Sequence, residues 1–321
     1  LHLSIRRQRQ MCIRDSYTMI PQILAGLIFK FYIFWNTKKT TIAPIMRPCM
    51  SDHPLTEHKG LDPKRLGALM SLSFFPYEVA LQLQRRIRDD RLAGSRPDTL
   101  ILLEHETVLT LGQTTKDSHW KEQSDMINKQ GIQIIKSERG GSVTFHGPGQ
   151  IVGYPILLLR EFCSGPKTYM RMLEEVIIAV LKEWGIKGRR IEKLIGVWVE
   201  DPQNPDGPLA KIAALGVKIS RGITTHGFAL NVAVDLQPFR LITPCGIENC
   251  HVTSMTEMLG SELDVPLVKK QVAHHFSRVF GIKWSDRVRE VSDLPLPNQD
   301  EGGKMISAVG VNLAPTSPNR R

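Results

Sequence analysis

Hydrophobic positions along the chain change between helical and strand-like spacing from about residue 61 onward. Apolar residues recur every three or four positions between Val79 and Ile87, which predicts an amphipathic helix that ends near Gly94. The apolar runs TLILLEH and TVLTLG come next and predict two strands. A chain that changes repeatedly between these two periods is typical of a mixed α/β domain.

The same alternation continues toward the C-terminus. A helix near residues 120–130 is expected to precede the strand IQIIKS, and an apolar stripe predicts the longest helix, from about Pro166 to Trp184. The segments GVW, KIAALGVKIS and THGFALN predict strands, and Pro266–Gly281 predicts a closing amphipathic helix. With three prolines, Asp201–Leu209 is predicted to be an exposed loop without a chemical role.

The two ends of the chain differ in composition from this domain, which we expect to span residues 61–290. Residues 1–60 are predicted to be an N-terminal extension that is disordered or a gene-model artefact, because RRQRQMCIRDS resembles translated sequencing adaptor. A membrane anchor or degenerate targeting segment is the alternative, although the apolar stretch Met19–Trp35 is marginal in length for a membrane span. Residues 291–321, rich in Pro, Ser and Asn, are predicted to be a disordered tail.

The net charge of +10 in 321 residues is concentrated at the N-terminus. Residues 1–50 contain eight Lys or Arg and one Asp, a balance of +7, so the remaining chain is only mildly basic. No stretch interleaves basic and aromatic residues, and nucleic-acid binding is therefore not expected. The five cysteines, at positions 12, 49, 163, 245 and 250, lack the paired spacing of a disulfide scaffold, which favours a reducing compartment such as the cytoplasm.

Cys245, in ITPCGI, and Lys211, in KIAALGVKIS, are the candidate reactive residues. A nucleophilic cysteine needs a cation beside it to become a thiolate at neutral pH, and a lysine amine can also accept the proton of an attacking amine. The pair therefore points to acyl transfer through a thioester. The alternative is that Cys245 is a small buried residue and Lys211 a solvated side chain. The spacing C-x4-C-H at Cys245–His251 lacks a second pair of ligands, so no metal site is expected.

A glycine-rich run, RGGSVTFHGPGQIVGY, extends from Arg139 to Tyr154. Its glycines let backbone N–H groups approach a ligand, and its two strand-like halves predict a β-hairpin. The run lacks the spaced glycines and terminal lysine of a phosphate loop, so it does not indicate nucleotide binding. Arg139, His146 and Gln150 favour a binding role for this run. His226, at the start of a later strand, either lines the same cleft or is a structural histidine.

Four motifs occur in one order: RGGSVTFHGPGQIVGY, GVW followed by KIAALGVKIS, THGFALN and ITPCGI. With these motifs, residues 65–285 resemble the octanoyltransferase family of lipoate biosynthesis. The resemblance implies an α/β (mixed α+β) fold with a mixed sheet flanked by helices, similar to the biotin and lipoate protein ligase catalytic domain. It also implies transfer of an octanoyl group from octanoyl-acyl carrier protein to a lysine of a lipoyl domain, through an acyl-enzyme thioester.

The resemblance implies a role for each matching position. Cys245 becomes the acyl-carrying nucleophile, and Lys211 the residue that promotes its thiolate form. The implied substrate-binding residues are Arg139, Gly140, Gly141, Ser142, Val143, Thr144, Phe145, His146, Ala214, Leu215, Gly216, Gly227, Phe228 and Ala229. His105 stands where the family carries a Glu-His pair, and no cofactor or metal is implied. For the oxyanion of the tetrahedral intermediate, we expect donors among the backbone N–H groups of Leu215, Gly216 and Gly246.

The implied partners are octanoyl-acyl carrier protein and the lipoyl domains of 2-oxoacid dehydrogenase acyltransferase subunits and of glycine cleavage H protein. The basic cluster Lys187, Arg189, Arg190 and Lys193 either attracts the acidic carrier protein or is a solvated connection. We expect no membrane association and a working monomer. Two other classes remain as alternatives: an ATP-dependent lipoate or biotin protein ligase, which would need no Pro-Cys-Gly nucleophile, and a non-catalytic module that binds an acylated carrier protein.

Overall fold

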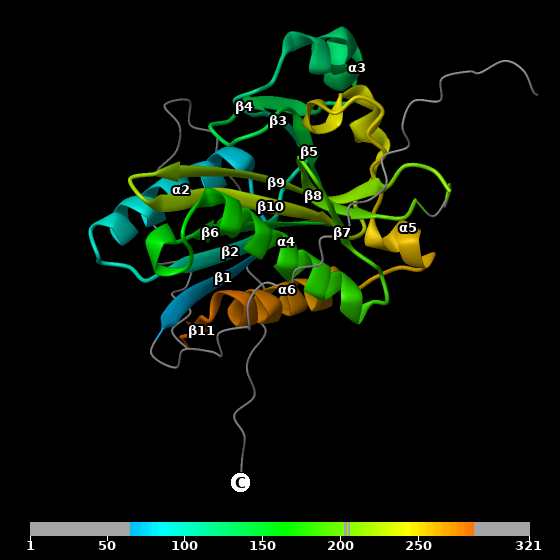
Figure 1. Cartoon of the computed structure of the whole chain (residues 1–321). Coiled ribbons are helices and arrows are strands. Elements are labelled where there is room, and N and C mark those ends of the chain that lie inside the picture. Colours follow the sequence, from blue (N-terminus) through cyan, green and yellow to red (C-terminus); the bar gives the residue numbers. More distant parts are fainter. Residues whose placement is uncertain (1–64, 202–203, 205, 286–321) are drawn as a thin grey trace, which may run out of the picture. The chain divides into compact units, whose positions relative to one another are not determined.

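A mixed β-sheet of eight strands forms the centre of the part of the chain that the structure describes (Figure 1). This structure is a computed structural model, and it describes residues 65–201, 204 and 206–285. In spatial order the strands are β11 (Lys283–Trp284), β1 (Leu66–Phe74), β2 (Thr99–Glu104), β6 (Gln150–Ile156), β10 (Ile223–Asn231), β9 (Ala210–Ser220), β8 (Leu194–Val199) and β7 (Arg189–Ile191). β1 runs parallel to β11 and β2, and the other neighbouring pairs are antiparallel. The expected mixed sheet is confirmed.

A smaller sheet of three strands is separate from the large one (Figure 1). Its strands are β4 (Gln133–Lys136), β3 (Val108–Leu111) and β5 (Thr144–His146), with β3 parallel to β4 and antiparallel to β5. Between β3 and β4 lie two 3-10 turns, Asp117–His119 and Lys121–Gln123, and the short helix α3 (Ser124–Lys129). The helix expected near residues 120–130 is therefore shorter than predicted, because Trp120, at φ −156°, interrupts the helical backbone.

Helices cover both faces of the large sheet (Figure 1). α4 (Pro166–Glu183) and α6 (Val265–Phe280) pack together on one face, and α2 (Tyr77–Leu92) lies on the other, while α5 (Met255–Leu259) precedes α6. The apolar stripe of α4 is fully buried in the core between helix and sheet, for example at Leu173 and Val180. Each such side chain contributes about 1.5–3 kcal/mol on burial, which fixes α4 on the sheet. The predicted helices that end near Gly94, near Trp184 and at Gly281 are confirmed as α2, α4 and α6.

The glycine-rich run does not form the expected β-hairpin. β5 belongs to the small sheet and β6 to the large one, so the turn at Gly147–Gly149 carries the chain between sheets. Gly149 has φ +83°, and a Cβ there would lie 2.6 Å from the Ala233 carbonyl group. The Gly149 N–H donates to the Glu104 carboxylate over 2.9 Å. This packing against two distant segments replaces the cross-strand bonds of a hairpin, and it places residues 139–146 opposite β9 and β10.

The predicted loop after β8 is not fully exposed. Asp201 is 7% exposed, and its carboxylate lies 3.1 Å from Nδ1 of His251. The expectation of exposure is therefore wrong at Asp201. A carboxylate can be buried when it has a polar partner, and here that partner is His251, from the segment after Cys245. The predictions for residues 1–60 and 291–321 lie outside the described residues.

Candidate active site

A cavity of about 390 Å³ opens between the β9–β10 pair and the segment 139–146. Exposed Lys193, in the turn between β7 and β8, lies at its outer rim. Buried residues form its inner end, among them Tyr77, Tyr154 and His226. The floor between rim and inner end consists of small residues from two strands, Ala214, Gly216, Gly227 and Ala229. A slender, mainly apolar ligand fits this shape.

Cys245 and Lys211 meet at the wall of this cavity. Lys211 Nζ donates a hydrogen bond to Cys245 Sγ over 3.1 Å, although 34 residues separate the two in sequence. The ammonium also lies 5.2 Å from the centre of the Trp198 ring, and a Cβ on Gly196 would lie 2.6 Å from Lys211 Cε. Lys211 is only 4% exposed, so the alternative of a solvated lysine is wrong. Packing against Trp198 and Gly196 therefore positions the amine of Lys211 toward the thiol of Cys245.

Backbone hydrogen bonds set the distance between these two side chains. The N–H of Cys245 donates to the Val143 carbonyl over 2.9 Å, and the N–H of Lys211 donates to the His251 carbonyl over 2.7 Å. Cys245 has φ 58°, a left-handed conformation that is uncommon for a residue with a side chain. Strained residues of this kind persist where the surrounding contacts over-determine them, and they cluster at functional sites.

Most of the residues that the resemblance implies for substrate binding line the cavity. They are Arg139, Gly140, Gly141, Ser142, Thr144, His146, Ala214, Leu215, Gly216, Gly227, Phe228 and Ala229. Val143 and Phe145 are instead buried in a separate hydrophobic cluster with Leu109 and Phe239. Successive side chains in the extended segment 142–145 point to opposite faces, so Val143 and Phe145 point away from the cavity that Ser142 and Thr144 line.

Arg139 is bound to the protein on several sides. Its guanidinium donates to the Thr110 carbonyl over 2.6 Å and to the Gly140 carbonyl over 3.1 Å. The side chain is buried, and burial lowers its pKa. These bonds attach the glycine-rich segment to β3, so Arg139 shapes the cavity wall in addition to lining it.

A buried polar network near the inner end joins two of the sequence motifs to the segment after Cys245. His146 lies with Nδ1 2.7 Å from Gln150 Oε1, and Gln150 Nε2 donates to Asn231 Oδ1 over 2.9 Å. Asn231 Nδ2 donates to the Thr253 carbonyl over 3.0 Å. Because Gln150 Oε1 can only accept, His146 carries a proton on Nδ1. Burial lowers the pKa of His146 well below its usual value, so the imidazole is neutral at pH 7.

Two further histidines are buried nearby. His105 donates from Nδ1 to the Phe75 carbonyl, and its Nε2 accepts from the Tyr154 hydroxyl, each over 2.6 Å. His226 lines the same cavity as His146, as one of the two alternatives predicted, and its backbone N–H donates to Gln84 Oε1 over 2.7 Å. Burial lowers the pKa of both imidazoles to about 4. Both are therefore neutral at pH 7.

These buried histidines predict a loss of stability in mild acid. A histidine in the unfolded chain has a pKa near 6.5, whereas His105 and His226 have pKa values of about 4 when folded. Only the unfolded state takes up these protons as the pH falls below 6.5, so their stabilisation is complete above pH 6.5 and is lost toward pH 4. We expect the free energy of unfolding, measured with urea, to fall by about 2 kcal/mol per histidine between pH 7.5 and pH 5. His105→Gln should reduce this fall, and an unchanged pH dependence would contradict the assignment.

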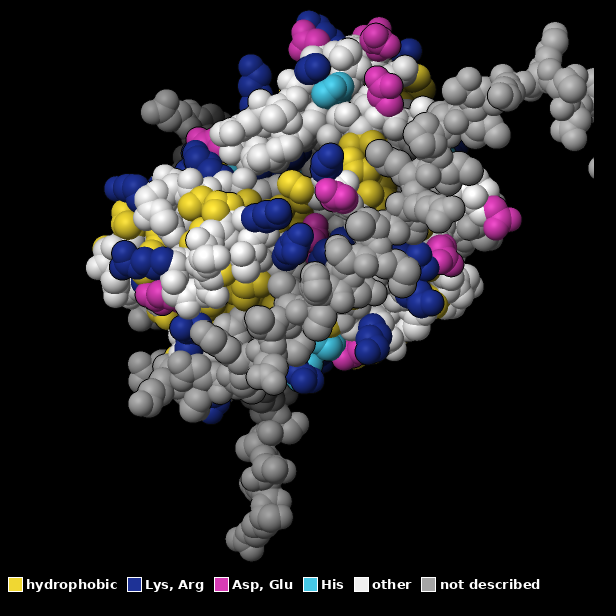
Figure 2. Space-filling model, in the orientation of Figure 1, with side chains coloured by type: hydrophobic (Ala, Val, Ile, Leu, Met, Phe, Trp, Pro, Cys, Tyr) yellow, Lys and Arg dark blue, Asp and Glu magenta, His cyan; other side chains and the backbone are white. Residues whose placement is uncertain are grey.

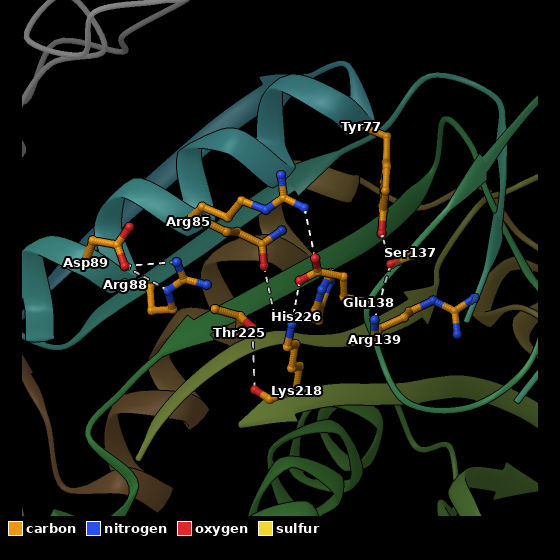
Figure 3. Close-up of polar contacts among 11 residues, drawn as sticks. Tyr77, Arg85, Arg88, Asp89, Ser137, Glu138, Arg139, Lys218, Thr225 and His226 are labelled. Atoms are coloured by element: carbon orange, nitrogen blue, oxygen red, sulfur yellow. Dashed lines mark hydrogen bonds and ion pairs between the residues drawn. The ribbon is translucent and has the colours of Figure 1, made fainter. Parts of the chain in front are cut away.

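Ion pairs hold the segment 137–140 in place beside α2 and β9 (Figure 3). The Glu138 carboxylate lies 3.2 Å from the Arg85 guanidinium and also pairs with Lys218. The hydrogen bond from Lys218 is the main cause that lowers the pKa of Glu138. Tyr77 Oη lies 2.8 Å from Ser137 Oγ in the same segment. Exposed pairs contribute little to stability one by one, so their main effect is to orient the segment over the cavity.

Backbone direction selects among the expected oxyanion donors. The Val217 carbonyl accepts from the Gly140 N–H over 3.0 Å, so the polar groups of Val217 point away from β10. Alternation along β9 gives the N–H of Leu215 the same direction and turns that of Gly216 toward β10. The N–H of Gly246 donates to a carbonyl within its own turn. The expectation for Gly216 and Gly246 is therefore wrong, and Leu215 remains the candidate.

Several residues at the cavity are absent from the sequence prediction. Tyr77 comes from α2 and Met170 from α4. His119, in a 3-10 turn, lies with Nδ1 2.6 Å from Oγ of Ser142. None of these three residues belongs to one of the four motifs, because each reaches the site through packing of a distant element.

Within residues 65–201, 204 and 206–285, no three His, Cys, Asp or Glu side chains are grouped so that they could hold a metal ion. No helix in that part of the chain is long and apolar enough to span a membrane. The cysteines described there, Cys163, Cys245 and Cys250, are free thiols.

Comparison with known families agrees with this geometry. Residues 76–277 match the lipoyl protein ligase A/B catalytic domain. The chain belongs to this family. An octanoyltransferase of Koribacter versatilis is 42% identical over 71% of this chain and 90% of the relative. An octanoyltransferase of Roseiflexus sp. is 41% identical over 68% of this chain and 89% of the relative. The match to the Myxococcus xanthus octanoyltransferase, 43% identical, covers 69% of this chain and 59% of that protein.

Solved structures confirm the fold of this family member. The bipartite lipoate protein ligase of Thermoplasma acidophilum has a TM-score of 0.52 and 17% identity over 69% of this chain and 86% of its own. A lipoate-protein ligase A bound with ATP has a TM-score of 0.50 and 17% identity over 68% of this chain and 87% of its own. At this identity the likeness shows the fold alone. The relatives near 40% identity are octanoyltransferases, so this member of the family is a transferase.

Proposed function

We propose that this protein transfers an octanoyl group from octanoyl-acyl carrier protein to a lysine of a lipoyl domain, through a thioester on Cys245. The observation that carries the proposal is the 3.1 Å hydrogen bond from Lys211 Nζ to Cys245 Sγ at the wall of a cavity with a buried inner end. The octanoyltransferase relatives support the acyl group and the class of reaction. This transfer is the first step of endogenous lipoate biosynthesis.

In the first half-reaction, the Cys245 thiolate attacks the thioester carbonyl of the donor. The Lys211 ammonium beside the sulfur favours the thiolate, and the N–H of Leu215 is the proposed donor to the oxyanion. The bond between the carbonyl carbon and the donor sulfur then breaks. The departing thiol takes a proton from Lys211, which becomes a neutral amine and leaves octanoyl-Cys245 in the site.

The octanoyl chain is proposed to lie over the small residues of the floor, with its end at Tyr154 and His226. Its six methylenes contribute on the order of 5 kcal/mol, at about 0.8 kcal/mol for each CH₂, before ordering costs. One carbon more or fewer therefore changes affinity only modestly. The buried side chains at that end, Tyr154 and His226, are proposed to limit the length of the chain.

The surface around the rim supports docking of an acidic carrier protein. In the view of Figure 2, Lys and Arg side chains are interspersed with hydrophobic and acidic ones. Lys193 and the 53% exposed Ile195 lie at the cavity rim, whereas Arg189 and Arg190 of the predicted basic cluster are paired with glutamates. Opposite charge would steer the carrier to Lys193. The proposed acceptors are lipoyl domains of 2-oxoacid dehydrogenase acyltransferase subunits and of glycine cleavage H protein, and a cytoplasmic monomer is the proposed working form.

Intact-protein mass spectrometry tests the proposed function. Mixed with octanoyl-acyl carrier protein, without ATP or acceptor, the protein is expected to gain one octanoyl group, which peptide analysis should locate on Cys245. Addition of a lipoyl domain should move that group to a lysine of the domain. Octanoylation that requires free octanoate and ATP would favour a ligase, and binding without an adduct would favour a non-catalytic module.

A further inference from the structure

We infer that Ser142 and His119 form a second proton route beside Cys245, which takes up a proton from the acceptor lysine. The inference rests on the proposed function and concerns its second half-reaction. Ser142 touches the substrate in this scheme, and His119 acts through Ser142.

The second half-reaction releases more protons than Lys211 can accept. The acceptor lysine arrives as an ammonium with three N–H bonds, and the amide product keeps one. As the N–C bond forms and the S–C bond to Cys245 breaks, one proton passes to the neutral Lys211 amine and restores the thiolate–ammonium pair. The other proton needs a different acceptor, because Lys211 is then already protonated and the sulfur leaves as the thiolate that pairs with it.

The contacts of His119 identify that acceptor. The backbone N–H of Lys116 donates to His119 Nδ1 over 3.3 Å, so this nitrogen carries no proton. Ser142 Oγ lies 2.6 Å from the same nitrogen, and its hydroxyl must therefore be the donor in that contact. The oxygen keeps its lone pairs for a group in the cavity, which Ser142 lines.

The pair packs directly against the turn that holds Cys245. The N–H of Thr243 donates to the His119 carbonyl over 2.8 Å. A Cβ on Gly246 would lie 3.0 Å from His119 Cε1 and 3.3 Å from Ser142 Cβ, so glycine is what permits this close approach. Ser142 is 3% exposed, whereas His119 is half-buried and can release a proton to solvent.

Each proton that the acceptor ammonium loses has an acceptor in this scheme. The acceptor ammonium gives one proton to Ser142 Oγ while the Ser142 hydroxyl proton moves to His119 Nδ1, and His119 then returns a proton to solvent. The neutral amine attacks octanoyl-Cys245, and its second proton goes to Lys211. The products are the octanoyl amide, the Cys245 thiolate and the Lys211 ammonium.

Single-turnover kinetics separate the two half-reactions. We expect Ser142→Ala and His119→Gln each to slow transfer from octanoyl-Cys245 to a lipoyl domain at least ~10-fold more than they slow formation of the adduct, since general bases typically contribute ~10²–10⁴-fold. Glutamine can still accept a hydrogen bond from Ser142 but cannot take its proton. In His119→Ala, added imidazole should restore transfer in part and leave adduct formation unchanged. Ser164→Ala, at an exposed serine outside the cavity, is the matched control.

Equal slowing of both half-reactions would assign the pair a structural role and overturn the inference. The inference is also overturned if Ser142→Ala or His119→Gln transfers the octanoyl group from Cys245 to the lipoyl domain at the wild-type rate. Ser142→Ala removes a single oxygen, so it provides the test even if the His119 variants fail to fold. Failure of the proposed function is distinguishable, because the adduct on the wild-type protein is measured before any acceptor is added. If no adduct forms at that stage, the proposed function itself is wrong.

Discussion

Cys245→Ala is expected to lower octanoyl transfer by at least ~10³-fold and to leave no octanoyl adduct on the protein. The reason is that the variant lacks the sulfur that Lys211 contacts and that carries the acyl group between donor and acceptor. Cys250 cannot take over this role, because burial raises the pKa of its thiol to about 11 and keeps it protonated at pH 7. Mass analysis of both the enzyme and the lipoyl domain measures the two effects.

Cys250→Ala is the matched control for this prediction. Both residues are partly buried free thiols in the same segment, and the 3.1 Å contact with Lys211 belongs to Cys245. We expect Cys250→Ala to keep the adduct and nearly the wild-type rate. An adduct that persists in Cys245→Ala and disappears in Cys250→Ala would move the nucleophile to Cys250.

Lys269→Met is expected to lower the free energy of unfolding by about 3–5 kcal/mol. Lys269 Nζ donates to the Glu104 carboxylate over 3.3 Å and to the Leu72 carbonyl over 3.0 Å. The two charged side chains are only 9% and 11% exposed, so removal of the lysine leaves a buried carboxylate without its counter-charge. Glu104 also accepts from the Gly149 N–H, and the damage therefore extends to the turn between the sheets. Thermal denaturation should show a midpoint lower by roughly 6–20 °C.

Two variants control for the loss of a lysine as such. Lys270→Met, at the exposed neighbouring position of α6, should change stability little. Glu104→Leu combined with Lys269→Met should recover part of the loss, since an apolar pair leaves no buried charge unpaired, while the Gly149 N–H still loses its acceptor. Equal stability of Lys269→Met and Lys270→Met would show that the ion pair does not stabilise this core.

Local patterns in the sequence are sufficient for the main elements and for the reactive groups. α4 and α6 repeat apolar residues at the helical period, and their ends carry helix signals, Pro166 at the start of α4 and the left-handed Gly281 after α6. Cys245 and Lys211 stand out because few side chains other than a thiol and an amine suit thioester chemistry. The strand-like alternation of residues 142–145 also separates two groups of side chains. Alternation alone places Val143 and Phe145 on the face opposite Ser142 and Thr144.

Tertiary structure decided what depends on contacts between distant segments. The turn Gly147–Gly149 is locally compatible with a hairpin or a crossover, and pairing of β5 with β3 and of β6 with β2 and β10 selects the crossover. Contact between Ser142 and His119 joins residues 23 positions apart, and that between Lys211 and Cys245 joins residues 34 apart. Backbone preference and available chemistry are local properties of a segment. The distances between its side chains and those of another segment result from packing of the whole domain, which no single segment encodes.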